Sequence, residues 1–250
     1  MAAEWAGFET VAQCEIDKYA SKVLAKNFKG VPNLHDIRTV TNERLAEYGI
    51  DGKEITVISA GFPCQPYSLA GKGRGDRDSR DLWDEVARVL REIKPPWFVG
   101  ENTPGLFARQ NQRFFRRVLD DLTALGYSVG WGIWGACDVG APHRRERVFI
   151  IAYTDSKRGV CLYQNIEKRC SALRLSSTSP GVAWKNIWTH QEVSRVFRIL
   201  RYTPKPDRKF ARDDNGLPQG VDRLRCLGNA VVPQQAYPIF KAIADFYKEK

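Results

Sequence analysis

The sequence predicts an α/β fold: a doubly wound parallel sheet with a small second lobe. Strand-like apolar runs alternate with amphipathic helical stretches through residues 1–154, and this alternation is typical of a parallel sheet covered by helices. It stops in residues 155–225, which are polar and basic with scattered aromatic side chains, and a last apolar helical pattern follows in residues 226–250. We therefore expect one domain made of residues 1–154 and 226–250, and a small lobe made of residues 155–225.

Each predicted element follows from the spacing of its apolar residues. Strands are expected over residues 8–16, 31–37, 56–61, 97–101, 127–136 and 148–153. Helices are expected over residues 18–28, 79–94, 113–125 and 235–247. The helix over 79–94 has the clearest pattern, with one apolar face made of Leu82, Val86, Leu90 and Ile93. Ligands of such a sheet bind beyond the carboxyl ends of its strands, which makes the residues at these ends candidate site residues.

Composition excludes several classes of protein. The chain has 250 residues, of which 43% are hydrophobic and 27% charged, as in soluble globular proteins. No run approaches the roughly 18 apolar residues of a membrane span, and no signal peptide is recognisable, so we expect a cytoplasmic protein without membrane segments. The six cysteines form no C-x-x-C pair and no zinc-like spacing with the three histidines. Neither a metal site nor a disulfide framework is therefore expected.

The positive charge of the chain is concentrated in one segment. Residues 155–225 hold fifteen Lys and Arg against seven Asp and Glu, a net charge of +8 out of +10 for the whole chain. A localised basic surface is the electrostatic footprint of a polyanionic partner, most simply nucleic acid. The alternative is a basic surface that only keeps the protein soluble.

Cys64 is the first candidate catalytic residue, because two prolines fix the backbone around it. A strand-like run over residues 56–60 ends at Gly61, and Pro63 and Pro66 follow on either side of the cysteine. A thiol is a useful nucleophile only as a thiolate that is presented rigidly to its target. The alternative interpretation is a buried structural cysteine in a tight turn.

Four short blocks occur in order along the chain. They are Gly-Phe-Pro-Cys-Gln at 61–65, Glu-Asn-Thr at 101–103, His-Arg-Arg-Glu-Arg at 143–147 and Gly-Asn-Ala-Val-Val-Pro at 228–233. In residues and spacing these blocks resemble the cytosine-5 DNA methyltransferase family, over nearly all of the chain outside the basic segment. The resemblance implies a Rossmann-like, S-adenosylmethionine-dependent sheet, with residues 155–225 as a target-recognition lobe. It also implies methyl transfer to carbon 5 of a cytosine that is flipped out of duplex DNA.

The resemblance implies a role for each catalytic candidate. Cys64 matches the thiolate that attacks carbon 6 of cytosine, and Glu101 matches the carboxyl group that hydrogen-bonds ring nitrogen 3 and the exocyclic amine. Arg145 and Arg147 match the arginines that hold the pyrimidine carbonyl and support the catalytic loop. Alternatively, Glu101 is a surface carboxylate, and Arg145 pairs with Glu146 or with phosphate.

The family's methyl donor is S-adenosylmethionine, and the resemblance implies a pocket for it. Glu15 ends a predicted strand, where an acid binds ribose hydroxyls in such folds, and Ile16 is expected to pack on the adenine. Asp36 and Ile37 match the adenine-contacting pair. The remaining expected pocket residues are Gly61, Phe62, Pro63, Leu82, Asn229, Ala230 and Val231.

Double-stranded DNA is the expected partner of a monomeric protein. The glycine-rich, basic stretch after Cys64 suits a mobile lid over DNA. The expected DNA-binding residues are Gln65, Ser68, Lys72, Arg74, Arg80, Arg195, Arg198 and Arg201.

The chain departs from the family pattern at its start. The family opens with a strand and a Phe-x-Gly-x-Gly loop around the methionine end of the cofactor, whereas this sequence starts Met1-Ala2-Ala3. We therefore expect weaker cofactor binding than with that strand present. Thr103 and His143 stand where the family usually has valine and glutamine. Two functions remain open for this chain. One is an active DNA methyltransferase of a restriction–modification or phage-like setting, and the other is a non-catalytic remnant that binds nucleic acid. An RNA cytosine methyltransferase is less favoured.

Overall fold

The computed structural model describes residues 1–63, 82–108, 111–139, 141, 143–154 and 230–248. These residues fall into two compact units. The first contains residues 1–37 and the C-terminal helix, and the second contains residues 38–137 and the strand that ends at Thr154. The predicted basic lobe over 155–225 lies outside the described residues, so the division into domains stays a prediction.

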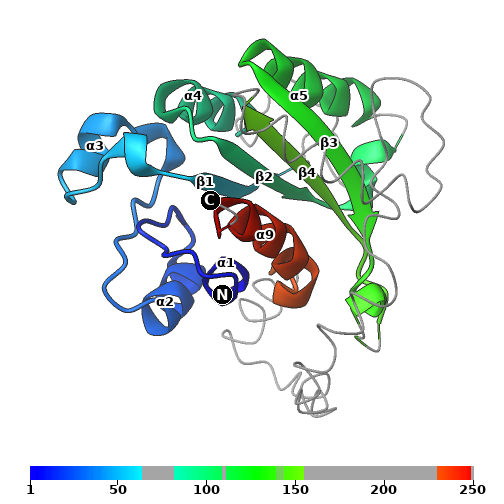
Figure 1. The fold of residues 1–250 in the computed structure, drawn as a ribbon, viewed down its shortest axis with the longest axis horizontal. Helices are drawn as coiled ribbons and strands as arrows, with labels where there is room; N and C mark the ends of the chain where they lie inside the picture. The colour runs from blue at the N-terminus through cyan, green and yellow to red at the C-terminus, as the bar shows by residue number, and fades with distance from the viewer. Residues whose placement is uncertain (64–81, 109–110, 140, 142, 155–229, 249–250) are drawn as a thin grey trace. The chain divides into compact units, whose positions relative to one another are not determined.

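A four-stranded sheet forms the second unit (Figure 1). Its strands are β1 (Val57–Gly61), β2 (Trp97–Asn102), β3 (Tyr127–Trp134) and β4 (Arg147–Thr154), in the spatial order β1-β2-β4-β3. All four strands were expected near these positions. β1 and β2 are parallel, whereas β4 is antiparallel to both β2 and β3. The α/β fold class is thus confirmed, whereas the expectation of a parallel sheet is wrong for the two pairs that β4 forms.

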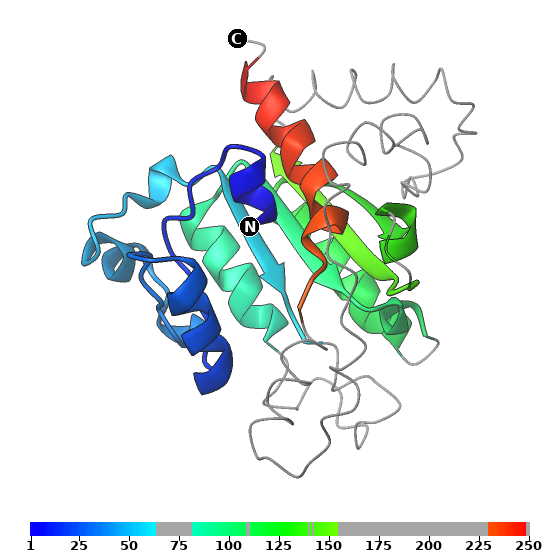
Figure 2. The same ribbon diagram turned by 90° about the horizontal axis from the view of Figure 1, so that it is seen from below.

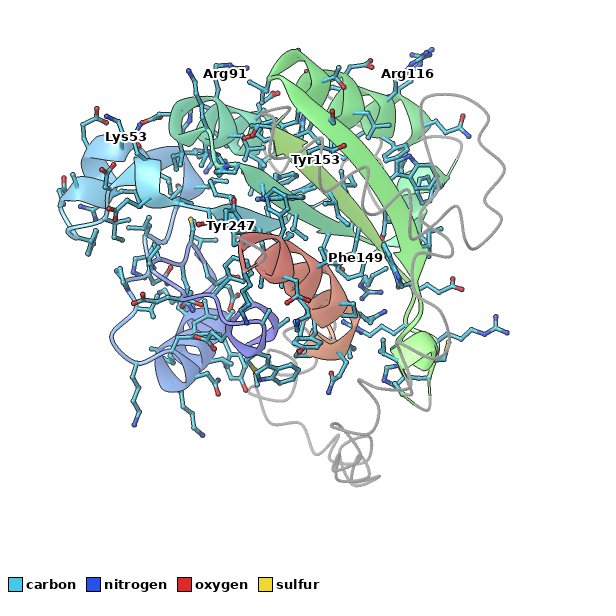
Figure 3. The ribbon with its side chains drawn as sticks, in the orientation of Figure 1. Lys53, Arg91, Arg116, Phe149, Tyr153 and Tyr247 are labelled. Atoms are coloured by element: carbon cyan, nitrogen blue, oxygen red, sulfur yellow. The ribbon has the colours of Figure 1, made fainter. Side chains whose placement is uncertain are left out.

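The connection between β3 and β4 explains this antiparallel pairing. A parallel neighbour requires a long crossover, usually through an α-helix. Apart from residues 140 and 142, which are not described, the connection between these two strands contains a short 3-10 helix, Ala136–Val139, and no α-helix. Cross-strand aromatic contacts then support both ends of β4. The rings of Trp97 and Tyr153 lie 5.4 Å apart, as do those of Trp134 and Phe149. Figure 3 labels Tyr153 and Phe149, the two members of these pairs that belong to β4.

Two helices lie on the same side of this sheet, α4 (Trp83–Ile93) and α5 (Gln112–Ala124), as Figures 1 and 2 show. Both were predicted. They bury their apolar faces, and the indole of Trp83 donates a hydrogen bond to Asp121 at 2.7 Å, which joins the two helices. Strand β2 is buried along most of its length, as a central strand is expected to be. The core of the unit therefore lies between β2 and these helices.

The second unit also contains elements that periodicity did not predict. A short helix, α3 (Asn42–Ala46), begins after Thr41, whose hydroxyl accepts the backbone N–H of Arg44. Among the described residues, a 3-10 helix over Ile37–Thr39 starts at the last residue of the segment 1–37 and continues into the second unit, which also contains the 3-10 helices Gly52–Glu54 and Pro104–Phe107. Elements this short contain too few residues to show an apolar period.

The first unit contains α1 (Ala2–Trp5), α2 (Lys18–Asn27) and α9 (Pro233–Lys248). Helix α1 packs on α9 (Figure 1), and α2 begins at the side chain of Asp17, which accepts two backbone N–H groups. The ring of Phe8 lies 6.2 Å from that of Phe240. The predicted helices over 18–28 and 235–247 are confirmed as α2 and α9. Among the described residues, no helix is long and apolar enough to cross a membrane.

The strands predicted over residues 8–16 and 31–37 are wrong. These segments share a single parallel bridge, between Gln13 and Asn33. Beyond it, the side-chain amide of Asn33 accepts the N–H of Glu15 and donates to the Glu15 carbonyl. The Asn33 side chain thus hydrogen-bonds the backbone groups of Glu15 that would otherwise pair with a neighbouring strand. The spacing of apolar residues does not indicate such a contact.

Candidate active site

The ends of three strands meet at one edge of the sheet. Gly61 at the end of β1 lies in register with Glu101 near the end of β2. Because β4 runs antiparallel to β2, its first residue, Arg147, lies at this same edge. The sheet thus brings together three residues that the sequence had singled out in three separate blocks.

Glu101 and Arg147 form an ion pair at this edge. The Nε atom of Arg147 lies 2.8 Å from Oε1 of Glu101, and the two side chains are only 12% and 15% exposed. A second nitrogen of the guanidinium donates to the Glu146 carbonyl at 2.8 Å. Charge-assisted bonds in partly buried surroundings hold their partners in a narrow range of positions. The orientation of the Glu101 carboxyl is therefore defined by β4.

Burial dominates the electrostatics of Glu101. Loss of hydration raises the pKa of its carboxyl, and the positive charges of Arg147 and Arg145 only partly oppose that effect. For Arg145, burial and the like charge of Arg147 lower the pKa, against the attraction of Glu101. A carboxyl with a raised pKa is more readily protonated, and so can donate a hydrogen bond as well as accept one.

Arg145 lies in a strained part of the loop before β4. Its φ of +33° is in the left-handed region, which favours glycine. The loop is held by a hydrogen bond from the Ala136 N–H to the Arg144 carbonyl. Such conformations persist only where the surrounding structure enforces them, and they often occur at functional sites.

Gly61 makes room for the second oxygen of the Glu101 carboxyl. A Cβ atom at position 61 would lie 3.2 Å from Oε2 of Glu101, closer than an ordinary van der Waals contact. The carboxyl therefore has Arg147 on one oxygen and the bare backbone of Gly61 beside the other. Sequence reasoning assigned Gly61 only to the cofactor pocket and missed this contact.

Asn102 ties the segment before Cys64 to the end of β2. Its side chain is 3% exposed; it donates to the Phe62 carbonyl at 2.9 Å and accepts the Thr103 N–H at 2.8 Å. The Phe62 ring is itself buried, 5.0 Å from that of Trp83. Sequence reasoning gave Asn102 no role, although the Glu-Asn-Thr block contained it.

The first unit contains a second group of candidate residues. One oxygen of Glu15 accepts the Asp17 N–H at 2.8 Å, and the next side chain, Ile16, is 66% exposed. The Asp36 N–H donates to the Leu34 carbonyl at 2.9 Å. Glu15 and Asp36 thus lie at the ends of the two segments that the Gln13–Asn33 bridge joins.

Cys14 lies close to both of these carboxylates. Its thiol donates to the His35 carbonyl at 3.3 Å, although the residue as a whole is exposed. Loss of hydration, together with the charges of Asp36 and Glu15, raises the pKa of Cys14 to about 11. Cys14 is therefore a thiol at neutral pH and not an activated nucleophile.

The other predicted site residues differ in exposure, and several of them lie outside the described residues. Pro63, Ile37 and Leu82 are partly exposed; Ala230 is exposed and Val231 is partly exposed just before α9. Those that lie outside the described residues are Cys64, Gln65, Ser68, Lys72, Arg74, Arg80, Arg195, Arg198, Arg201 and Asn229. Among the side chains that the structure describes, no cluster of three or more could hold a metal ion.

The chain is similar to several known proteins in its amino-acid sequence. The family model described as "C-5 cytosine-specific DNA methylase" matches residues 1–179. Type II methyltransferase M.NgoBI of Neisseria gonorrhoeae is 38% identical over 154 residues, which are 60% of this chain and 45% of that protein. Type II methyltransferase M.HaeII of Haemophilus aegyptius is 29% identical over 219 residues, covering 79% of this chain and 66% of that protein.

A solved structure is also similar. It is that of a prophage-encoded protein of E. coli described as a DNA modification methyltransferase, with 25% identity and a TM-score of 0.52. The match covers 61% of this chain and 42% of that one. This chain therefore spans less than two thirds of the length of each of these three proteins.

Proposed function

This chain belongs to the C-5 cytosine-specific DNA methylase family, and on that premise we propose that it is a DNA (cytosine-5) methyltransferase. It transfers a methyl group from S-adenosylmethionine to carbon 5 of a cytosine flipped out of duplex DNA. The observation that carries this proposal is the partly buried carboxyl of Glu101, with its raised pKa, held by Arg147 beside Gly61.

Cys64 and Glu101 share the activation of the cytosine ring. The Cys64 thiolate adds to carbon 6, and the electron pair of the 5,6 double bond moves toward carbon 5, which becomes nucleophilic. In its protonated form Glu101 donates a hydrogen bond to ring nitrogen 3, which draws electron density from the ring and favours this attack. Arg147 holds the Glu101 carboxyl, and Arg145 is assigned to the pyrimidine carbonyl. After methylation, water takes the proton from carbon 5, the electron pair of that C–H bond re-forms the 5,6 double bond, and the bond from carbon 6 to sulfur breaks to release the Cys64 thiolate.

The residues of the first unit fit the adenosine part of S-adenosylmethionine. The carboxylates of Glu15 and Asp36 can accept hydrogen bonds from ribose hydroxyls and from the adenine amine, and the exposed Ile16 offers an apolar surface to a flat base. By the family resemblance alone, we also assign to S-adenosylmethionine binding the residues Ile37, Phe62, Pro63, Leu82, Asn229, Ala230 and Val231. When bound, S-adenosylmethionine supplies an electrophilic methyl group.

Covalent trapping tests the proposed chemistry. A duplex in which every cytosine is replaced by 5-fluorocytosine presents any target sequence, and fluorine at carbon 5 prevents release of the enzyme. With S-adenosylmethionine, the wild-type chain should form a protein–DNA adduct that survives denaturation. Cys64→Ser should form none, whereas Cys137→Ser, a change at an exposed cysteine, should form it normally. An adduct with Cys64→Ser, or none with wild type, would overturn the proposal.

We further propose that the basic segment over residues 155–225 binds the DNA. Its net charge of +8 should make the affinity fall steeply with salt, and exchanging Arg195, Arg198 and Arg201 for glutamine should flatten that dependence. Gln65, Ser68, Lys72, Arg74 and Arg80 are assigned to the same partner. Salt-dependent DNA binding without any 5-fluorocytosine adduct would favour the alternative, a non-catalytic nucleic-acid-binding protein.

A further inference from the structure

One side chain in the first unit connects the two segments that contain Glu15 and Asp36. The Oδ1 atom of Asn33 accepts the Glu15 N–H at 2.9 Å and the His35 N–H at 3.1 Å. Its Nδ2 atom donates to the Glu15 carbonyl at 3.0 Å and to the Ser21 hydroxyl at 3.1 Å, and lies 3.2 Å from Nδ1 of His35. A single amide therefore satisfies both backbone groups of Glu15 and orients the turn that leads to Asp36.

The backbone alone holds these segments together weakly. In the described part of the chain, only the Gln13–Asn33 bridge pairs them. The turn is also strained, because His35 has a φ of +61°, in the region that favours glycine. The bond from the His35 N–H to Asn33 helps to offset that strain, and Asp36 follows directly.

The chemistry of the position is specific for asparagine. Both backbone N–H groups meet the amide oxygen, and the Glu15 carbonyl and Ser21 hydroxyl meet the amide nitrogen. An aspartate would have nearly the same shape but would bring an oxygen against the Glu15 carbonyl, while an alanine would leave all of these groups without the side chain.

We propose that Asn33 is a positioning residue of the S-adenosylmethionine site. Its amide holds Glu15 and the His35-Asp36 turn in the relative position in which they bind the adenosine part of the cofactor. In this role Asn33 acts through Glu15 and the His35-Asp36 turn, which its side chain holds, and not through a bond to the ligand. This inference rests on the proposed function, and it adds the residue on which the geometry of the two carboxylates depends.

Calorimetry with S-adenosylhomocysteine tests this inference on the full chain. Asn33→Ala and Asn33→Asp should each bind at least about tenfold more weakly than wild type, because one charge-assisted hydrogen bond is worth about that factor. The matched control is Asn27→Ala in the same unit, which removes a side-chain bond to the Val23 carbonyl in α2. It should bind like wild type.

A second ligand distinguishes a role of Asn33 in positioning Glu15 from a role in the general stability of the protein. The 2′-deoxyribose analogue of S-adenosylhomocysteine lacks one hydroxyl that Glu15 is proposed to bind, so wild type should prefer the parent ligand by about tenfold. The ratio of the two affinities should fall toward one in Glu15→Gln and in both Asn33 variants. Asn33→Asp keeps the size and one acceptor of the side chain, so it serves if Asn33→Ala does not fold.

The outcomes distinguish the two ideas. If wild type binds S-adenosylhomocysteine, and both Asn33 variants keep its affinity and ribose preference, this inference is wrong while the proposed function stands. Failure of both variants to fold would overturn the inference too, since it would assign Asn33 a general structural role. If wild type binds no S-adenosylhomocysteine and forms no 5-fluorocytosine adduct, the proposed function fails, and the inference with it.

Discussion

The guanidinium of Arg147, in the first residue of β4, lies 2.8 Å from the carboxyl of Glu101 near the end of β2. This contact exists because β4 runs antiparallel to β2, so that its beginning lies at the edge where β1 and β2 end. The pair is mostly buried, and yet burial outweighs the attraction in its effect on the Glu101 carboxyl. The site therefore keeps a carboxyl group that is easier to protonate than a solvated one.

Ionisation of the Glu101 carboxyl should lower the free energy of unfolding of the protein as the pH rises toward neutral. Because its pKa is raised above the ordinary 4.5 in the folded state, its stabilising contribution is complete below that value and is lost as the pH rises through the folded-state pKa. Relative to wild type, Glu101→Gln should therefore gain stability as the pH rises from about 4 to about 8. Thermal unfolding across this range measures the difference between the two curves.

Glu43→Gln is the control, because the pKa of Glu43 is shifted in the opposite direction to that of Glu101. Local hydrogen bonds from its own backbone and from Thr41 lower the pKa of the exposed Glu43, so its contribution is present above the ordinary value and is lost in acid. A stability difference for Glu101→Gln that does not change with pH would contradict the prediction.

Gly61→Ala should slow methyl transfer without weakening DNA binding. The added Cβ, 3.2 Å from Oε2 of Glu101, must displace the carboxyl, and small displacements of catalytic groups cost up to about a hundredfold in rate. Single-turnover methylation and a binding titration measure the two effects. Gly105→Ala is the matched control, since its Cβ would meet the Thr103 hydroxyl at 3.3 Å, a group without a proposed role. Equal losses in both variants would argue against a role for the Gly61 contact.

Asn102→Ala should lower stability and also slow trapping by Cys64. It leaves the Phe62 carbonyl and the Thr103 N–H without their side-chain partner, which costs roughly 1–3 kcal/mol. Urea unfolding and the rate of 5-fluorocytosine adduct formation measure the two effects. Tyr127→Phe removes a buried bond to the Pro95 carbonyl and should lower stability by about 1 kcal/mol with an unchanged trapping rate. Normal trapping by Asn102→Ala would mean that this bond does not align the segment before Cys64.

Cys14 should resist alkylation in the folded protein. With a pKa of about 11 in place of 9.0, its thiolate fraction at pH 8 is roughly a hundredfold below that of an ordinary cysteine. Iodoacetamide labelling followed by peptide mapping should therefore modify Cys14 far more slowly in the native protein than in urea. Rapid native labelling of Cys14 would show that its sulfur is not shielded as described.

The periodicity of apolar residues was sufficient to predict the main elements of the described sheet and helices. Strands β1 to β4 and helices α2, α4, α5 and α9 all begin and end near the expected residues. Strand direction could not be predicted in the same way, because a buried strand has the same apolar pattern whether its neighbour is parallel or antiparallel. The segments over 8–16 and 31–37 have a strand-like composition, but their backbone pairing depends on the side chain of Asn33.

For the site, the sequence by itself determined the family and singled out Glu101, Arg145 and Arg147 as candidates, because short blocks with fixed chemistry can be read from residue types. Only the tertiary structure decided which atoms meet. Asn102 reaches the Phe62 carbonyl across 40 positions, and Asn33 reaches Glu15 across 18. The space beside Gly61 is filled by a carboxyl from another strand. Such contacts depend on how distant segments are brought together in space, and the local pattern of residues does not contain that information.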